Sequence, residues 1–448
     1  MLNGKPIAII GGGLAGLTAA NHLRQHGVPV VLFEAGPKVS GLAQSHMDSD
    51  GFSLDVGAHF ISNRLAGSVG IGGQSRLVKY YGESVWLRGK TYTYPLGLAA
   101  VPRFATAAVL SRLSKRSAHD AAAEFTSRYG EALAREVAIP ITEAWSGASA
   151  RDLSPEVVSK LQHGVLKVAA LKRAARKSGR AVCSGYSQTL PEHSGVWHVY
   201  PEGGVTTVCE RLANPVVDAI RLECPAEKVY IENNHAVGVR AGGRDYEVSG
   251  VVSTAPCPPL ARMIAGSSAL EEISRFRYRP MVFVNLRFSR RAILPDTVLW
   301  TPGRDVPFFR LTETTISMPW LAPEGKAIIT ADIGCETTSA VWTMDPERLG
   351  QLCLDSLEEI RPGAKSSYIG CRVLKTAVAY PVFLLSYEDA RRKWQRSTGI
   401  SGLWSVGRNG EFAHLLMEDV YWRTKWKMTD AVMHWRNPAR MTDSLVTA

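Results

Sequence analysis

The strongest constraint on the fold of this chain is a βαβ pattern in residues 7–34. Residues 7–10 are four apolar residues in a row, which is typical of a buried parallel strand. The motif G-x-G-x-x-G follows directly at residues 11–16, residues 17–25 have the pattern of a helix that Gly27 ends, and residues 28–33 form a second apolar run. This order predicts an α/β fold built on a Rossmann-like dinucleotide-binding unit.

Each residue of the motif has a physical role in such a unit. Gly11 permits the tight turn after the first strand, Gly13 lets the backbone approach a pyrophosphate, and Gly16 lets the helix pack closely on the sheet. Leu14 and Ala15 open the helix, so their N–H groups face the pyrophosphate at the positive end of the helix dipole. The motif alone is weak evidence, and it gains weight here from the strands and the helix around it.

The second strand closes on an acid, Glu34, eighteen residues beyond Gly16. A carboxylate at this place binds ribose hydroxyls, and it repels a 2′-phosphate, which argues against NADP. An ordinary surface acid at the end of a strand is the alternative interpretation of Glu34.

Residues 34–45 resemble the extended motif of flavoproteins, in which an acid is followed by a glycine pair and a small hydroxyl residue. The resemblance implies that the cofactor is FAD rather than NAD. It also implies that this segment contacts FAD through Glu34, Ala35, Gly41, Leu42 and Ala43. The chain has Ser40-Gly41 where the family has two glycines, and because Ser40 is small we expect the turn to survive.

Residues 51–62 resemble the flavin-facing strand and loop of the protoporphyrinogen oxidase and amine oxidase superfamily, in its branch near UDP-galactopyranose mutase. That branch has Gly-Gly-His where this chain has Gly57-Ala58-His59. The two small residues let the backbone run against the isoalloxazine ring. The resemblance makes His59 the candidate catalytic residue, and an ordinary structural histidine is the alternative.

The resemblance extends along most of the chain, through residues 90–96, 139–147, 200–204 and 406–419. It implies that the backbone of Val229 pairs with the adenine. Gly407 and Arg408 are expected to approach the cofactor phosphates, and Glu418 matches the family's acid near the flavin. No cysteine lies close to Gly407 and Arg408, so we expect FAD to be bound without a covalent link.

The motifs predict two interleaved domains. The FAD-binding domain would comprise residues 1–65, 196–265 and 396–448. A helical insertion at 66–195 and a β-rich insertion at 266–395, which has strand-like runs at 281–288 and 327–333, would form a mixed α+β substrate domain. A hairpin is expected at Asn233-Asn234 between two alternating runs.

The resemblance implies an oxidase or dehydrogenase in which FAD accepts a hydride from a C–N or C–C bond of a small substrate. A redox-neutral nucleotide-sugar mutase is the alternative enzyme, and its diphosphate would need residues such as Arg277, Tyr278, Arg279 and Arg287. A non-catalytic flavin-binding subunit is the third possibility, because fold alone does not decide function.

The net charge of +11 is concentrated, since residues 157–191 contain seven Lys or Arg and no acid. A solvated helix face is the ordinary interpretation, and attraction of an anionic substrate or weak contact with a membrane surface is the functional one. The stretch lacks the interleaved aromatics typical of nucleic-acid binding. Seven scattered cysteines predict no metal site, and without an export motif we expect a cytoplasmic protein, whose oligomeric state the sequence does not indicate.

Overall fold

A parallel sheet of five strands forms around the N-terminal βαβ unit. The computed structural model describes residues 4–57, 59–113, 118–161, 165–264 and 270–437. The strand order is β10-β2-β1-β14-β20, and every neighbouring pair is parallel. The bounds are β1 (Ile7–Ile10), β2 (Val30–Phe33), β10 (Ile220–Arg221), β14 (Gly250–Ser253) and β20 (Leu403–Ser405). We propose that residues 1–65, 196–265 and 396–448, which supply these strands, form one domain.

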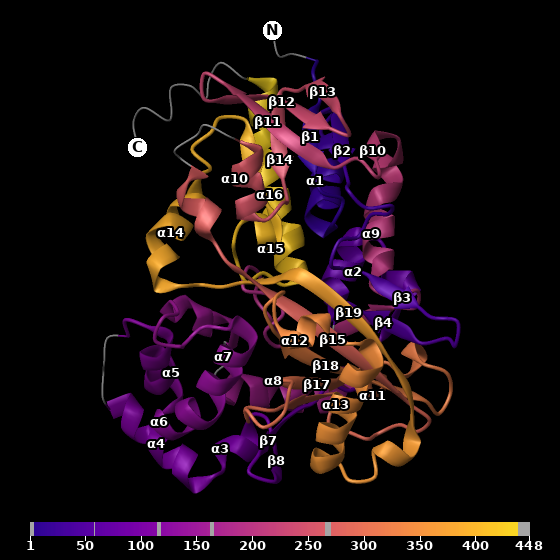
Figure 1. Ribbon diagram of the computed structural model, residues 1–448, viewed down its shortest axis with the longest axis vertical. Helices are drawn as coiled ribbons and strands as arrows, with labels where there is room; N and C mark the ends of the chain where they lie inside the picture. The colour runs from indigo at the N-terminus through magenta and orange to yellow at the C-terminus, as the bar shows by residue number, and fades with distance from the viewer. Residues whose placement is uncertain (1–3, 58, 114–117, 162–164, 265–269, 438–448) are drawn as a thin grey trace.

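Helices cover one face of this sheet. The helix α1 (Leu14–Gln25) packs against the long helix α16 (Met417–Arg436) and against α9 (Thr206–Ala213), and the three lie together beside the sheet in Figure 1. The apolar residues of α1, including Leu17 and Leu23, are fully buried in this interface. The contact fixes the N-terminus of α1 at the carboxyl end of β1.

An antiparallel hairpin sheet covers the other face. It consists of β11 (Ala226–Glu232), β12 (His235–Ala241) and β13 (Arg244–Glu247) in that order. Asn233 and Asn234 turn the chain between β11 and β12 with φ of 47° and 59°, the left-handed values that a two-residue hairpin turn requires. The predicted hairpin at this pair is confirmed.

A mixed sheet of seven strands forms the other end of the molecule (Figure 1). Its order is β19-β15-β18-β17-β16-β7-β8, with bounds β7 (Glu83–Leu87), β8 (Lys90–Thr93), β15 (Tyr278–Phe288), β16 (Val298–Trp300), β17 (Arg310–Glu313), β18 (Ala327–Gly334) and β19 (Tyr368–Pro381). The strands predicted at 281–288 and 327–333 are confirmed as β15 and β18. Alternating residues of β15 pack on opposite faces: Val282 and Val284 contact α13 (Pro346–Ile360), and Met281 and Phe283 face a helical cluster.

The insertion at 66–195 is not purely helical, contrary to the prediction. It supplies the hairpin β7–β8, whose turn at Arg88 and Gly89 has φ of 53° and 74°. β7 pairs with β16 and so extends the large sheet. Residues 83–87 show no regular alternation of buried and exposed positions, so the sequence carried no clear signal of this strand.

Six α-helices follow this hairpin in the described part of the insertion. They are α3 (Leu96–Ala99), α4 (Pro102–Leu113), α5 (Ala121–Tyr129), α6 (Glu131–Leu133), α7 (Ile139–Ser146) and α8 (Val165–Ser178). Nearer the start of the insertion lie the end of α2 (Asn63–Val69) and β6 (Ser75–Leu77). β6 pairs with β9 (His198–Pro201), which also pairs with β5 (Ile61–Ser62). No helix in the described ranges combines the length and the apolar character needed to cross a bilayer.

Candidate active site

The glycines of the first motif form a tight cradle between β1 and α1. Gly11 has φ of 98°, and it donates its N–H to the Phe33 carbonyl at the end of β2 over 2.8 Å. A Cβ on Gly16 would lie 1.9 Å from the Gly11 carbonyl oxygen, so no larger residue fits there without moving backbone. Gly13 is the N-cap of α1 and brings no side-chain cap to the helix, which leaves the N–H groups of Leu14 and Ala15 for an external acceptor.

The segment after β2 closes against this cradle. Ser40 donates its N–H to the Gly12 carbonyl over 3.0 Å, and a Cβ on Gly41 would lie 3.3 Å from Gly13 Cα. The turn survives the replacement of glycine by Ser40, as expected, but with a φ of 128° that residues with a side chain rarely adopt. Ser40 is buried, and within the described part of the chain its Oγ has no hydrogen-bond partner.

Glu34 lies at the edge of the cradle. Its Oε2 accepts the Gly12 N–H over 2.6 Å, and its Oε1 accepts the Gly36 N–H over 2.8 Å. A carboxylate has about four acceptor positions, so these two bonds orient Glu34 and leave lone pairs for two hydroxyl groups. This arrangement suits the predicted contact with a ribose.

The C-terminal motif meets the same cradle from the opposite side. Gly407 has φ of 80° at the start of α15 (Gly407–Gly410), and a Cβ there would lie 2.7 Å from the Cβ of Ala15. Arg408 follows, donates its Nε–H to the Leu415 carbonyl over 2.8 Å and stands 5.6 Å from the centre of the Tyr380 ring. Burial lowers the pKa of Arg408, and no carboxylate of the described residues forms an ion pair with it.

A cavity of about 350 Å³ opens beside the cradle. The segments predicted to face the flavin contribute Leu42, Gly57, His59, Arg408 and residues 415–417 to its wall. The opposite wall comes from the two insertions and is largely aromatic and aliphatic, with Tyr94, Leu98, Tyr129, Val137, Ile141, Phe283, Trp300 and Tyr380. One cavity therefore joins the predicted cofactor segments to the predicted substrate domain.

The carboxylate in the wall accepts a hydrogen bond from an aromatic side chain at each of its two oxygens. Glu83 accepts the Tyr81 hydroxyl over 2.8 Å at one oxygen and the Trp300 indole N–H over 2.9 Å at the other. Burial, and then the charge of Glu83, raise the pKa of Tyr81 well above its usual value, and burial likewise raises that of Tyr186. Both phenols therefore remain neutral at physiological pH.

The buried arginine of the wall is neutralised. Arg310 forms an ion pair with Asp332, which is completely buried in β18. Burial alone would lower the pKa of Arg310, but the neighbouring carboxylate raises it, so the pair stays charged. The Nε–H of Arg310 is also buried and lacks a hydrogen-bond partner among the described residues.

His59 lies in the cavity wall next to a fixed carboxylate. Its Nδ1 is 3.7 Å from Oδ2 of Asp55, and it is buried with no hydrogen-bond partner in the described ranges. Asp55 is held in place by the hydroxyls of Ser45 and Tyr200, each over 2.6 Å. A small rotation of the imidazole would let Nδ1 donate to Asp55 and leave Nε2 as an acceptor.

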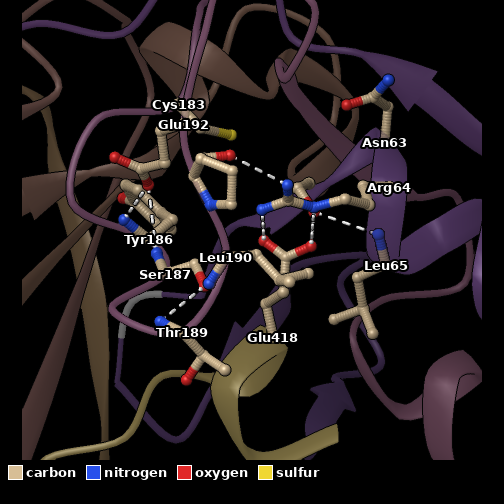
Figure 2. Close-up of polar contacts among 12 residues, drawn as sticks. Asn63, Arg64, Leu65, Cys183, Tyr186, Ser187, Thr189, Leu190, Glu192 and Glu418 are labelled. Atoms are coloured by element: carbon tan, nitrogen blue, oxygen red, sulfur yellow. Dashed lines mark hydrogen bonds and ion pairs between the residues drawn. The ribbon is translucent and has the colours of Figure 1, made fainter. Parts of the chain in front are cut away.

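Glu418 does not have the surroundings expected of a cofactor ligand. Arg64 binds both of its oxygens, at 2.6 Å and 3.1 Å, and Ser62 donates to it over 3.0 Å (Figure 2). Arg64 also donates to the Pro191 carbonyl over 3.0 Å. Glu418 thus ties the start of α16 to the loop 184–192. We propose a structural role for it, and its contact with the flavin stays a prediction.

The same loop is held by two further carboxylates. Glu192 accepts the backbone N–H groups of residues 185–187, as Figure 2 shows for Tyr186. Asp419 accepts the Ser187 hydroxyl over 2.8 Å and the N–H groups of residues 188 and 189. The loop places Tyr186 and Gln188 in the cavity wall, so these contacts shape one side of the cavity.

The remaining predicted contacts are spread more widely. Ala35 is exposed on the turn after β2, and Ala43 is buried in the core beneath the cradle. Val229 lies on β11, where it pairs with Val239 and packs near Phe33, away from the cavity wall. Ala58 falls outside the described residues.

Several wall residues were not predicted. Tyr94 lies in residues 90–96, which resemble a segment of the family, and this signal could have indicated it. Tyr81, Tyr186, Trp300 and Arg310 carry no motif, and only the folding of distant segments brings them together.

The residues around the cradle fit FAD. The uncapped start of α1, the close approach of Gly13 and Gly41, and the half-buried Arg408 suit a pyrophosphate. The orphaned Oγ of Ser40 is a buried polar atom beside the cradle that a cofactor would satisfy.

Comparisons with known proteins agree with the assignment of FAD as the cofactor. Residues 14–408 match the family model of flavin-containing amine oxidoreductases. Two similar solved structures are a reduced UDP-galactopyranose mutase (TM-score 0.78, 17% identity, 97% of this chain and 96% of that chain) and a protoporphyrinogen oxidase-like protein from Exiguobacterium (0.73, 15%, 97% and 100%). A third is the cyclohexylamine oxidase of Brevibacterium oxydans (0.70, 16%, 96% and 99%).

A curated relative with a local match is 4,4′-diaponeurosporene oxygenase of Staphylococcus aureus, 40% identical over 58 residues. That match covers 13% of this chain and 12% of the relative. The solved structures, all below a quarter identity, show the fold alone, whereas the family model covers most of the chain. The chain therefore belongs to the flavin-containing amine oxidoreductase family and is an FAD-dependent oxidoreductase.

Proposed function

We propose that this enzyme removes a hydride from a C–N or C–C bond of a small substrate whose reacting part is uncharged and largely apolar. The observation that carries the proposal is the single cavity whose wall combines Gly57, His59 and Leu415 with apolar residues of the insertions such as Leu98 and Val137. When bound, FAD supplies the hydride acceptor. The protein supplies a dry, shaped site with a few polar groups, as small-molecule sites generally do.

The cavity gives little support to an anionic reacting group. Of its two arginines, Arg310 is neutralised by Asp332, and Arg408 stands beside the cofactor cradle. The basic stretch at 157–191 contributes to the wall only through its uncharged end, residues 184–188. An anionic group on the substrate, if present, would lie away from the bond that reacts.

We propose His59 as the group that takes up the proton released when the hydride leaves the substrate. It lies in the wall, and Asp55, fixed by Ser45 and Tyr200, can orient the imidazole through Nδ1. Tyr81 and Tyr186 are poor candidates for a base, because their raised pKa values keep them protonated.

The mutase alternative lacks a diphosphate site in the predicted place. Arg277 and Arg279 both pair with Glu336, and Arg287 pairs with Asp48 and Asp50. Tyr278 donates its hydroxyl to the Asn409 carbonyl. These four residues are absent from the cavity wall, so they give no cationic cluster there. A non-catalytic role fits poorly with a cavity that reaches the cofactor segments.

The proposal is tested by anaerobic titration of the purified holoenzyme with apolar amines and other compounds that have activated C–H bonds, while the flavin absorbance is recorded. A substrate should bleach the flavin. Leu98→Trp should slow the bleaching by filling the cavity, while Leu96→Trp on the same helix α3, where the side chain is exposed, should not.

Both variants should keep the flavin spectrum of the wild-type protein, which shows that the cradle is intact. Equal bleaching rates in Leu98→Trp and wild type would contradict the assignment of the cavity as the substrate site. His59→Gln should slow bleaching with FAD retained, and His46→Gln, outside the wall, is its control.

A further inference from the structure

The solvent-facing side of α4 is apolar where an exposed helix face is normally charged. Its exposed residues recur three and four positions apart, at 102, 103, 105, 106, 109 and 110, and so form one face. Val109 is 60% exposed and Leu110 is 66% exposed. Among the described side chains of this face Arg103 is charged, and it pairs with Glu136 over 2.7 Å.

The neighbouring helix α3 continues this apolar face and leads to the cavity. Leu96 is 56% exposed, whereas Pro95, Leu98 and Ala99 of the same segment line the cavity wall. α3 packs against α4, and both helices lie at the end of the molecule opposite β1 and α1 (Figure 1). We call Leu96, Val109 and Leu110 the apolar face.

A basic helix stands next to the apolar face. α8 packs against α3, and its Lys172 donates to the Tyr94 carbonyl beside Pro95. The outward side of α8 exposes Arg173 and Lys177, four residues apart on one face. The acids of the adjoining helices are already paired, Glu124 with Arg128 and Glu131 with Arg135. Within the described part of the chain, neither Arg173 nor Lys177 forms an ion pair.

We propose that the apolar face and the basic side of α8 together dock the enzyme onto an anionic lipid surface. Exposed aliphatic side chains insert at the boundary of the acyl chains, and flanking Lys and Arg bind anionic headgroups. The proposed binding is at the membrane surface, and no helix in the described ranges is long and apolar enough to cross the bilayer. The surface adjoins α3, so an apolar substrate dissolved in the bilayer can reach the cavity wall directly.

An anionic lipid surface accounts for both the apolar face and the basic side of α8. A protein partner would explain the apolar residues but not a flank of basic residues that carries no acid from 157 to 191. A soluble anionic substrate would explain the basic residues but not Leu96, Val109 and Leu110. The inference concerns binding alone and does not depend on which bond the enzyme oxidises.

The test is sedimentation of the holoenzyme with vesicles of phosphatidylcholine alone or of equal parts phosphatidylcholine and phosphatidylglycerol. We expect preferential binding to the anionic vesicles that weakens as salt is added. The double variant Arg173→Gln/Lys177→Gln should lower the partition coefficient about thirtyfold. Val109→Ser/Leu110→Ser should lower it by about tenfold or more for each residue.

The matched control is Val217→Ser/Arg348→Gln, which changes an equally exposed apolar residue and an exposed base elsewhere and should bind as wild type does. Retained flavin absorbance verifies that every variant is folded. Wild-type protein that stays in the supernatant with both vesicle types would overturn the proposal. So would loss of binding in the control variant that equals the loss in the two test variants.

Discussion

Gly16 gives the sharpest test of the cofactor cradle. It lies in the first turn of α1, where a Cβ would be 1.9 Å from the carbonyl oxygen and 3.1 Å from the carbonyl carbon of Gly11. Both are backbone atoms of a turn that Phe33 anchors through a hydrogen bond, so neither can rotate away as a side chain does. Gly16→Ala must therefore push α1 away from β1 or reshape the turn.

The expected magnitude follows from two opposing terms. Replacing a helical glycine by alanine ordinarily stabilises a protein by about 0.5–1 kcal/mol. At Gly16 the clash costs about 1–3 kcal/mol or more, because overpacking here moves backbone. We expect a net loss of about 2 kcal/mol in the free energy of unfolding. Gly67→Ala is the control, since Gly67 is exposed in α2 (Asn63–Val69) and its Cβ would meet nothing within 4 Å.

The assay is urea denaturation followed by tryptophan fluorescence, together with titration of FAD into the stripped protein. Gly16→Ala should lose both stability and FAD affinity, because the displaced helix no longer presents its N-terminus to the pyrophosphate. Gly67→Ala should gain up to about 1 kcal/mol and bind FAD as wild type does. A Gly16→Ala protein that gains stability in the same way would refute the reasoning.

Three further outcomes can be checked by urea titration. Ser40→Gly should stabilise the FAD-free protein by about 1 kcal/mol, because it relieves the positive φ and removes a buried hydroxyl without a described partner; unchanged or lower stability would contradict this. Arg64→Ala should lower the free energy of unfolding by about 3 kcal/mol, because it leaves the buried carboxylate of Glu418 without its cationic partner. Arg76→Ala, which breaks an exposed ion pair, should lower it by less than about 1 kcal/mol. Burial lowers the pKa of His198 from 6.5 to about 3, so the unfolded chain binds a proton that the folded one excludes. The free energy of unfolding should therefore fall by about 1.4 kcal/mol for each unit by which the pH is lowered between 6.5 and about 3. His198→Gln should remove this contribution to the pH dependence.

Local backbone demands explain why the cradle could be predicted. Gly11, Gly13 and Gly16 are fixed by a turn, a close approach and a helix contact within a few residues of each other, so their spacing is visible in the sequence. The Asn233-Asn234 hairpin was predictable for the same reason. The family resemblance added FAD and the C-terminal motif, which no local rule connects to the first sixty residues.

Long-range contacts explain what could not be predicted. Glu418 matched the family's acid, yet its partner Arg64 is 354 residues away, and nothing in the sequence pairs the two. The cavity wall likewise takes Tyr81, Tyr186 and Trp300 from three separate segments. The strand β7 was not predicted, because its pairing partner β16 lies about two hundred residues further on.

The most direct measurement of the central claim is the rate of anaerobic flavin bleaching by one substrate, compared with the same substrate deuterated at the carbon to be oxidised. The account predicts that the flavin is reduced as the substrate is oxidised and that deuterium slows the bleaching. It further predicts that the slowing persists in Leu96→Trp. A flavin that no candidate bleaches, in a protein that converts a nucleotide sugar once its flavin is reduced chemically, would contradict the account.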